Sequence, residues 1–187
     1  MEPSPRSGRL LVATPTIADP NFERSVVLVL EHDPEGTLGV VLDRPSDVEV
    51  AELLPTWAGL LSAPTAMFTG GPVQREAVVA VARRATGAPA EIDGYRPITD
   101  TLGVVDLTGD PALLAAHLTG MRCFAGYAGW TSGQLVAEIR AGAWWVVDGI
   151  DDDVLGREPD GLWRRVLRRQ PGERAWFATY PADPVVN

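Results

Sequence analysis

The chain has 187 residues, an apolar content of 45% and a formal net charge of −9, a combination that suits one compact acidic domain. The acidic balance disfavours direct DNA binding, because negative surfaces repel the phosphate backbone, and no stretch approaches the roughly 20 apolar residues of a membrane span. Residues 1–7 carry no apolar run and are predicted to form a disordered arm before a single domain over 8–187, with the cytoplasm as the expected compartment.

The domain is predicted to begin with three strands. GRLLVATP, over 8–15, reads as a strand that Pro15 ends. SVVLVLEH, over 25–32, is a continuous apolar run rich in β-branched residues, which is typical of a strand buried on both faces. The turn sequence DPEG then leads into a partner strand, LGVVLDRP, over 38–45. The two runs are predicted to pair as an antiparallel hairpin around the turn at 33–36.

The next segment mixes a short helix with further strands. Ser46 and Glu49 have the spacing of a capping box, so SDVEVAELLP is predicted to be a helix that Pro55 ends. AMFTGGPV is expected to be a strand that runs into a glycine turn, and AVVAVAR, over 77–83, to be another apolar strand. Residues 84–101 show no regular pattern and are predicted to be irregular.

The second half of the chain continues this mixture. LGVVDLTG reads as a strand, after which Asp110 is predicted to cap a helix that starts at Pro111. MRCFAGYAGW is strand-like, and Thr131 and Gln134 again have capping-box spacing at the start of a helix. AWWVVDG predicts a strand, DDDVLGREPDGLWRRVLRR one or two short helices, and ERAWFATYPADPVVN an extended aromatic tail. Because strands and helices mix without regular alternation and several strands form hairpins, the pattern predicts an α+β domain.

The stretch GYAGWTSGQL, over 126–135, is the first candidate site. Its glycines and capping residues suit a tight turn between a strand and a helix, although a helix start behind a glycine-rich turn can also hold an anion. The chain has no lysine and lacks the spacing of a phosphate loop, which disfavours nucleotide binding. Tyr127 and Trp130 either line a pocket or pack in the core, and core packing is favoured for Trp130.

The hairpin carries the second candidate. His32 and Asp33 adjoin its turn and Asp43 and Arg44 end its second strand, so we expect these four side chains to share one rim. A histidine beside carboxylates can act as a general base. Ion pairs and hydrogen bonds that fasten the end of the hairpin explain the same residues, and this structural interpretation is favoured.

The turn FTGGPV, over 68–73, is the third candidate, because its two glycines expose backbone N–H groups that either contribute to a pocket or only reverse the chain. All three turns follow strand ends, where ligand sites often lie, so the sequence predicts that they gather around one concavity. The predicted pocket residues are His32, Asp43, Arg44, Gly70, Gly71, Tyr127 and Trp130.

Neither a metal nor a cofactor is expected. The chain has two histidines, His32 and His117, and one cysteine, Cys123, whose apolar surroundings favour a buried thiol over a nucleophile. No G-x-S-x-G elbow occurs, and Ser25 lies roughly 23 Å from His32 along one strand, too far for a catalytic triad. The four arginines of GLWRRVLRR, over 161–169, are interpreted as a solvated helix face rather than a nucleic-acid patch.

These motifs together resemble the YqgE/AlgH family of bacterial proteins. The resemblance rests on GRLLVATPTIADPNFERSVVLVLEHDPEGTLGVVLDRP, FTGGPVQ and GYAGWTSGQLVAEI followed by AWW, which occur in the family's order and span about residues 8–180. It implies a single α+β domain with a branched sheet, part of it curled into a small barrel, and helices around it. The family pattern usually reads Asn-Arg-Pro where this chain has Asp43-Arg44-Pro45, a departure that adds a negative charge.

The resemblance implies no established enzymatic activity. Some members are named as transcriptional regulators, but this chain shows no convincing helix-turn-helix pattern. Three classes of function stay open: a regulatory or adaptor protein that acts through a protein or small-molecule partner, a hydrolase-like enzyme that uses the His32/Asp43 rim, and a regulator that binds DNA directly. The first is preferred because the sequence shows no nucleophile, metal or cofactor motif.

Overall fold

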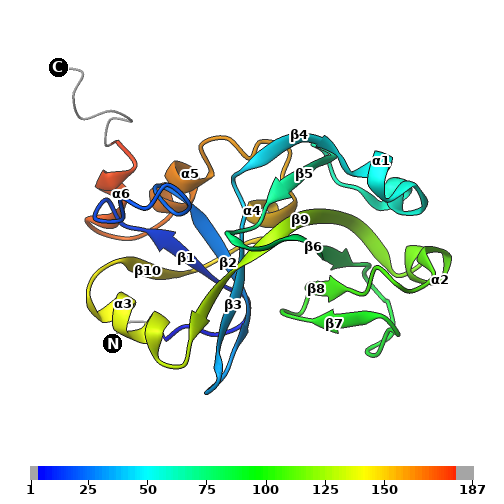
Figure 1. The fold of residues 1–187 in the computed structure, drawn as a ribbon, viewed down its shortest axis with the longest axis horizontal. Helices are drawn as coiled ribbons and strands as arrows, with labels where there is room; N and C mark the ends of the chain where they lie inside the picture. Colours follow the sequence, from blue (N-terminus) through cyan, green and yellow to red (C-terminus); the bar gives the residue numbers. More distant parts are fainter. Residues whose placement is uncertain (1–3, 180–187) are drawn as a thin grey trace.

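One long strand, β9 (Leu118–Thr131), crosses the structure and joins its two halves (Figure 1). The computed structural model describes residues 4–179. The other strands in this range are β1 (Arg9–Ala13), β2 (Val26–His32), β3 (Gly36–Val41), β4 (Pro45–Glu49), β5 (Ala66–Thr69), β6 (Val73–Arg84), β7 (Tyr95–Pro97), β8 (Leu102–Val105) and β10 (Trp144–Asp148). The helices are α1 (Val50–Leu53), the 3-10 helix η1 (Pro55–Leu60), α2 (Pro111–Ala115), α3 (Gln134–Arg140), α4 (Asp151–Leu155), α5 (Leu162–Arg168) and α6 (Arg174–Phe177).

The strands form one curled sheet in the order β10-β1-β2-β3-β9-β6-β8-β7. The first half of β9 pairs antiparallel with β6, where Val79 lies opposite Phe124, and its second half pairs with β3, where Leu38 lies opposite Gly129. β5 runs parallel to β9 at Phe68 and carries β4, so the sheet branches there. The result is a half-barrel with short helices around it, which confirms the predicted α+β class (Figure 1).

The predicted hairpin is confirmed as β2 and β3. His32 lies opposite Thr37 next to the turn. The Asp33 carboxylate closes the turn by accepting hydrogen bonds from the N–H groups of Glu35 and Gly36, at 2.8 and 3.0 Å. This is the local chemistry that aspartate offers at the first position of a turn.

The apolar run of β2 is buried on both faces, as its sequence indicates. Val26, Leu28 and Leu30 point into the large cluster inside the curl, which also receives side chains of α4 and α5. Val27 and Val29 point to the other face, into a second cluster that contains Trp130 and residues of α3 and β10. β2 therefore connects both cores, which explains why it has no polar residue before its end.

The predicted helix over 46–54 is wrong in its first half, which forms β4. Ser46 donates its hydroxyl to the carbonyl oxygen of Met67 at 2.7 Å, and Glu49 accepts a hydrogen bond from the Thr65 hydroxyl at 2.8 Å. Both side chains that suggested a capping box are thus occupied by the β5 side of the structure, and pairing with β5 outweighs the local helix signal. Only the short α1 remains helical.

Two other predicted helix starts, at Asp110 and at Thr131, are confirmed in full and in part. The Asp110 cap is confirmed, because its carboxylate accepts from the N–H of Ala112 at 2.9 Å. At α3 the residue before the helix is Gly133, in the left-handed region at φ 73°. The Gln134 side chain still accepts from the N–H of Thr131 at 3.0 Å, so half of the predicted capping box is formed.

Two segments predicted without regular structure contain short elements. β7 lies within 84–101 and pairs with β8, and α6 replaces part of the predicted extended tail. Residues 180–187 of that tail and 1–3 of the predicted arm lie outside the described residues. No helix within 4–179 is long and apolar enough to cross a membrane.

Candidate functional site

A groove of about 540 Å³ lies beside the tip of the β2–β3 hairpin, and we call it the hairpin groove. Strand pairing builds it, since Leu38 lies opposite Gly129 and Val73 lies opposite Tyr127. Two predicted pocket residues, Tyr127 and Trp130, are among those that line it. The full lining is Glu31, Asp33, Glu35, Gly36, Thr37, Leu38, Val73, Tyr127, Gly129, Trp130 and Thr131.

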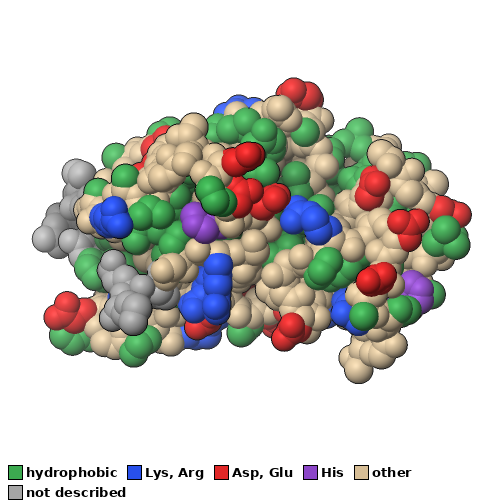
Figure 2. Space-filling view, turned by 90° about the horizontal axis from the view of Figure 1, so that it is seen from below, with side chains coloured by type: hydrophobic (Ala, Val, Ile, Leu, Met, Phe, Trp, Pro, Cys, Tyr) green, Lys and Arg blue, Asp and Glu red, His purple; other side chains and the backbone are tan. Residues whose placement is uncertain are grey.

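The hairpin groove combines apolar and acidic surface. Leu38 and Val73 expose 39% and 36% of their surface and both line the groove, so they give it adjoining apolar surface. Three acidic side chains, Glu31, Asp33 and Glu35, line the same groove. Seen from the side of the hairpin tip, acidic side chains gather beside apolar surface near the middle of the face (Figure 2). This combination suits a ligand that is itself apolar and positively charged.

His32 does not line the hairpin groove. The Nδ1 atom of His32 lies 2.6 Å from the hydroxyl oxygen of Thr37, its cross-strand neighbour. The observed interaction of His32 is therefore a hydrogen bond within the hairpin, as the structural interpretation expected.

The structure does not bring His32 and Asp43 together. His32 pairs at the tip of the hairpin, whereas Val27 pairs with Val41, two residues before Asp43, at the opposite end. Five residues of extended strand between positions 27 and 32 span roughly 16 Å. The predicted rim grouped residues that precede the turn with residues that follow it. Asp43, however, comes a full strand length after the turn.

Asp43 lies instead in a second concavity of about 320 Å³, which we call the Asp43 cleft. Burial raises the pKa of Asp43 from 3.8 to about 7, against the opposing effects of Arg44 and of the backbone N–H groups of Val26 and Asp43. Arg44 donates to the carbonyl oxygens of Pro20 and Glu23, at 2.7 and 3.0 Å, so it fastens the loop before β2. The cleft is lined by Arg24, Asp43, Asp160, Gly161, Trp163 and Arg164.

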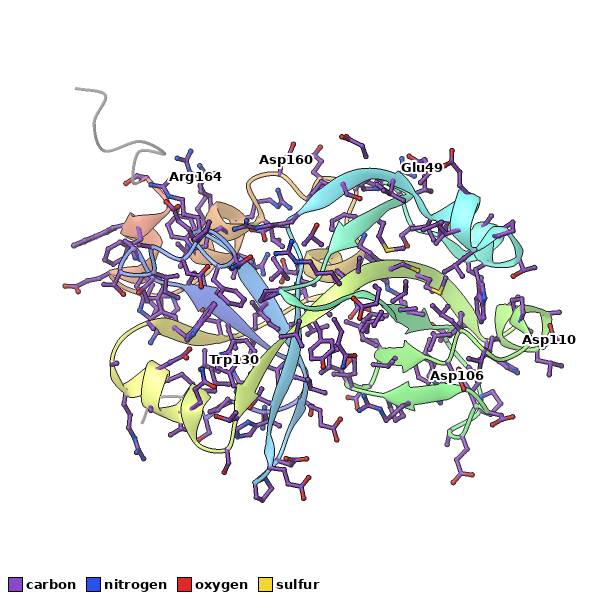
Figure 3. The ribbon with its side chains drawn as sticks, in the orientation of Figure 1. Glu49, Asp106, Asp110, Trp130, Asp160 and Arg164 are labelled. Carbon is purple, nitrogen blue, oxygen red and sulfur yellow. The ribbon has the colours of Figure 1, made fainter. Side chains whose placement is uncertain are left out.

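Trp130 packs in the core, as predicted, with only 6% of its surface exposed. Its indole N–H donates to Oε2 of Glu138 at 2.9 Å, which ties the end of β9 to α3 (Figure 3). Its ring lies 6.1 Å from that of Phe22 and 5.9 Å from that of Trp144, measured between centroids. Trp130 therefore supports the wall of the hairpin groove more than it offers surface to a ligand.

Gly70 and Gly71 lie where the sheet branches. Gly70 accepts a hydrogen bond from the N–H of Val41 and donates to the carbonyl of Ala125, both at 2.8 Å. A Cβ atom at Gly71 would lie 2.1 Å from the carbonyl carbon of Tyr127. These glycines thus permit a close approach of backbones, and neither lines the hairpin groove or the Asp43 cleft.

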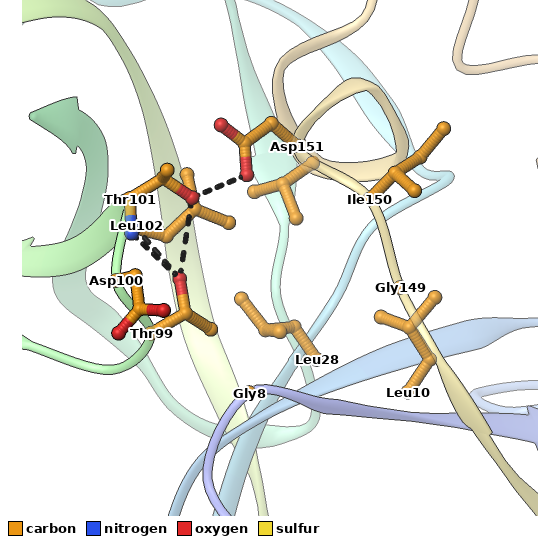
Figure 4. Close-up of a pocket in the computed structure, with 11 residues that line it drawn as sticks. Gly8, Leu10, Leu28, Thr99, Asp100, Thr101, Leu102, Gly149, Ile150 and Asp151 are labelled. Carbon is orange, nitrogen blue, oxygen red and sulfur yellow. Dashed lines mark hydrogen bonds between the residues drawn. The ribbon is translucent and has the colours of Figure 1, made fainter. Parts of the chain in front are cut away.

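A third cavity, of about 270 Å³, lies between the start of β1 and the start of β8 (Figure 4). The Thr101 hydroxyl donates to Oδ1 of Asp151 at 2.7 Å, and Arg83 donates to Oδ2 at 2.9 Å. The Thr99 hydroxyl oxygen accepts from the N–H of Leu102 at 2.9 Å. These polar groups form hydrogen bonds within the protein, so we interpret the cavity as a junction between two parts of the curled sheet.

The arginine-rich helix, α5, is largely fastened to its own surroundings. Arg165 donates to the carbonyl oxygens of Glu158 and Asp160. Arg169 makes two hydrogen bonds to the Asp153 carboxylate, at 2.9 and 2.5 Å. The four apolar residues of the helix, Leu162, Trp163, Val166 and Leu167, are buried, which agrees with the predicted arginine face on the opposite side.

Cys123 and the potential metal ligands give no further candidate site among residues 4–179. Cys123 is fully buried, and burial raises the pKa of its thiol to about 12, which suits a packed thiol and not a nucleophile. Among residues 4–179, no group of three or more His, Cys, Asp or Glu side chains is placed to hold a metal ion.

The lining of the hairpin groove extends beyond the residues predicted for a pocket. Asp33 belongs to the predicted rim, whereas Glu31 and Glu35, which flank it in EHDPE, were not singled out, although their place beside the hairpin turn is a local signal. Leu38 and Val73 carry no comparable signal, because they meet only through their separate pairings with β9.

Comparisons with known proteins agree with the fold. The family model described as "DUF179: AlgH-like" matches residues 10–175. A UPF0301 protein of Streptomyces coelicolor is 51% identical over 188 residues, covering 100% of this chain and 97% of that protein. A UPF0301 protein of Thermobifida fusca is 49% identical over 195 residues, covering 97% of this chain and 95% of that protein.

Two solved structures are similar over nearly the whole chain. The crystal structure of protein DIP2367 from Corynebacterium diphtheriae has a TM-score of 0.92 at 36% identity, covering 96% of this chain and 95% of that one. The solution structure of AlgH from Pseudomonas aeruginosa has a TM-score of 0.66 at 26% identity, covering 98% of this chain and 99% of that one. The chain therefore belongs to the AlgH-like, or UPF0301, family.

Proposed function

We propose that this protein is a regulatory or adaptor protein that binds a basic segment of a partner protein in the hairpin groove. The observation that carries the proposal is the meeting of three carboxylates, Glu31, Asp33 and Glu35, with the exposed aliphatic side chains of Leu38 and Val73. Glu31 also forms an exposed ion pair with Arg96, at 3.8 Å, which a basic partner would displace. Carboxylates select positive partners and steer their approach, whereas the apolar surface supplies contact area.

The groove favours recognition by side chains. β3 and β9 pair with each other there, so the backbone groups that face each other are already hydrogen-bonded and are not available to an added strand. The partner segment that fits best carries an apolar residue, which contacts Leu38 and Val73, between lysines or arginines, which face Glu31 and Glu35. Since exposed ion pairs contribute only about 0.2 to 1 kcal/mol each, we expect weak binding in which the carboxylates select the partner and the apolar contact supplies most of the affinity.

The hydrolase-like alternative needs an acid–base pair within hydrogen-bond reach. Its two proposed members, His32 and Asp43, lie at opposite ends of the hairpin, and the Nδ1 atom of His32 is occupied by Thr37. The geometry therefore supports binding better than it supports this catalytic arrangement.

The proposal is tested with two labelled peptides of equal length, one that repeats Lys-Leu-Lys and one that repeats Glu-Leu-Glu. Fluorescence anisotropy with the full chain should detect saturable binding of the basic peptide only. The double substitution Glu31→Gln with Glu35→Gln should weaken this binding about threefold to tenfold, because it removes two exposed ion pairs. Leu38→Ser should weaken it as well, without any change in charge.

The matched control is Asp47→Asn with Glu91→Gln, which removes two exposed carboxylates outside the groove. It changes the net charge by the same amount and should leave the affinity unchanged. Equal weakening by both double variants would mean that the peptide responds only to total charge, and the proposal would fail.

A further inference from the structure

One edge of β9 is open where this strand borders the hairpin groove. The N–H of Leu42 donates to the carbonyl oxygen of Val26 at 2.9 Å, so the even-numbered residues of β3 direct their backbone groups to β2. The odd-numbered residue Thr37 therefore directs its backbone groups to β9, where it lies opposite Trp130. Backbone groups point alternately to the two sides of a strand, so the N–H and C=O of Gly129 point away from β3.

No strand of the part of the chain that the structure describes lies on this open side of Gly129. β6 pairs with β9 only as far as Tyr127, which lies opposite the first residue of β6, Val73. Further along β9, the N–H of Thr131 is bonded to the side chain of Gln134 at 3.0 Å. Gly129 is exposed and lines the groove, so it presents one backbone donor and one backbone acceptor there.

The packing of the chain does not require a glycine at position 129. Its φ lies outside the left-handed region. A Cβ atom there would lie 3.6 Å from the Tyr127 ring and 3.9 Å from the Val73 side chain, which is ordinary van der Waals contact. Glycine in the interior of a strand is less stable than alanine and often marks a place where another backbone approaches closely. Gly129 thus keeps the floor of the groove open for an incoming chain.

The strand register places an acidic, an apolar and an open position in one row. Glu31 lies opposite Leu38, and Leu38 lies opposite Gly129. Residues directly opposite one another in neighbouring strands share a face of the sheet. A residue that pairs with Gly129 from the open side would therefore present its side chain on the same face as Leu38 and Glu31.

We propose that the partner segment binds as an extended strand along this edge of β9 and exchanges backbone hydrogen bonds with Gly129. The inference rests on the proposed function and specifies its partner: an apolar residue pairs with Gly129, and lysines or arginines lie two residues to either side. In an extended chain these three side chains share a face, so they meet the apolar floor and the carboxylates together. A second copy of this chain fits less well, because its net charge of −9 would meet three carboxylates.

The test uses a labelled peptide, Gly-Lys-Ser-Leu-Ser-Lys-Gly, and two versions that are N-methylated at single residues. Methylation of the leucine N–H removes a hydrogen bond to β9 and should weaken binding to the full chain about threefold to tenfold in fluorescence anisotropy. The N–H of the serine after leucine points away from β9, so methylation there should change the affinity little.

Amide hydrogen exchange followed by NMR observes Gly129 itself. Its N–H should exchange rapidly in the free protein, whereas those of Ala128 and Trp130, which face β3, should be protected. The unmethylated peptide should slow exchange at Gly129 about tenfold when about nine-tenths of the protein is occupied, because exchange then occurs mainly from the free fraction.

Gly129→Ala should not lower the melting temperature and should weaken binding, because the added methyl group occupies the floor of the groove. The matched control is Gly59→Ala on η1, where an added Cβ meets nothing within 4 Å, and it should bind normally.

The outcomes separate this inference from the proposed function. Binding that depends on Glu31 and Glu35 but leaves exchange at Gly129 unchanged, or that weakens equally with both methylated peptides, would overturn the inference and leave the proposed function standing. If none of the basic peptides shows saturable binding, both fail.

Discussion

Trp130 and Trp144 donate their indole N–H groups to the same carboxylate oxygen, Oε2 of Glu138, at 2.9 and 2.8 Å. Phe22 packs against both rings, with centroid distances of 6.1 and 5.6 Å. One side chain of α3 thus joins the end of β9 to β10. The stretch GYAGWTSGQL is therefore mainly a structural junction, and its outer edge at Tyr127 and Gly129 borders the hairpin groove.

Trp130→Ala should lower the free energy of unfolding by about 3 to 5 kcal/mol, because it removes a buried aromatic ring and leaves a cavity. This is a large part of the roughly 5 to 15 kcal/mol available to a domain. Urea denaturation measures the loss. Trp176→Ala, which removes an indole that is 71% exposed, is the matched control and should change the stability by less than about 0.5 kcal/mol. A fully stable Trp130→Ala protein that has lost peptide binding would assign Trp130 to recognition instead.

Asp43→Asn should stabilise the protein above pH 7 and change its stability little near pH 4. Burial raises the pKa of Asp43 from 3.8 to about 7, so the folded protein holds this proton more tightly than the unfolded chain does. The stability of the unsubstituted protein therefore falls as the pH rises from about 4 to about 7 and stays lower above that range. The asparagine variant does not titrate, and each pKa unit is worth about 1.4 kcal/mol, so the difference is on the order of a few kcal/mol.

Urea unfolding at about pH 4, 6 and 8 measures this pH dependence. Asp47→Asn, at an exposed carboxyl, serves as the control and should show no comparable trend. A gain in stability on Asp43→Asn that is the same at all three pH values would contradict the assigned pKa.

Arg122→Met should destabilise the protein by about 3 kcal/mol, because it leaves buried carbonyl groups without a donor. The Arg122 side chain donates to the carbonyl oxygens of Ala63, Val154 and Gly156, and its guanidinium carbon lies 4.4 Å from the centroid of the Phe68 ring. Burial also lowers the pKa of Arg122 to about 10, so this cation is held by backbone dipoles at a desolvation cost.

Thermal denaturation compares Arg122→Met with Arg96→Met, since the Arg96 side chain is 53% exposed and its ion pair with Glu31 is exposed on both sides and contributes little to stability. The Arg96 variant should behave like the unsubstituted protein. Equal stability of the two variants would show that the three carbonyl contacts of Arg122 contribute nothing net.

The isolated protein should bind duplex DNA no better than other acidic proteins do. Its net charge is −9, and Arg165 is engaged by the carbonyl oxygens of Glu158 and Asp160. A gel shift at physiological salt measures this. Sequence-specific retention that is lost on Arg165→Ala with Arg168→Ala would refute the expectation and support a direct DNA-binding regulator.

Local chemistry explains which parts of the fold were predictable. The β2–β3 hairpin and the cap at Asp110 depend on residues that are neighbours in sequence, and both are confirmed. The capping-box pattern at Ser46 and Glu49 is equally local, but both side chains form hydrogen bonds with residues in or just before β5 instead. A local pattern therefore fails where a long-range pairing offers the same groups better hydrogen bonds.

The candidate sites show the same limit. Tyr127 could be placed at a concavity from its glycine-rich turn, whereas its contact with Val73 depends on how β6 meets β9. Asp43 was marked as unusual by its charge, but its cleft requires Arg24 and Trp163, which come from segments far apart in the chain. Composition and residue spacing do not predict these contacts, because the contacts arise from the curl of the sheet.

Charge reversal in the hairpin groove tests the central claim most directly. The double substitution Glu31→Lys with Glu35→Lys replaces the carboxylates that are assigned to partner selection and spares Asp33, which closes the turn. In fluorescence anisotropy, the unsubstituted protein should prefer the Lys-Leu-Lys peptide and the reversed variant should prefer the Glu-Leu-Glu peptide. A reversed variant that folds and still prefers the basic peptide would contradict the assignment of this groove as the partner site.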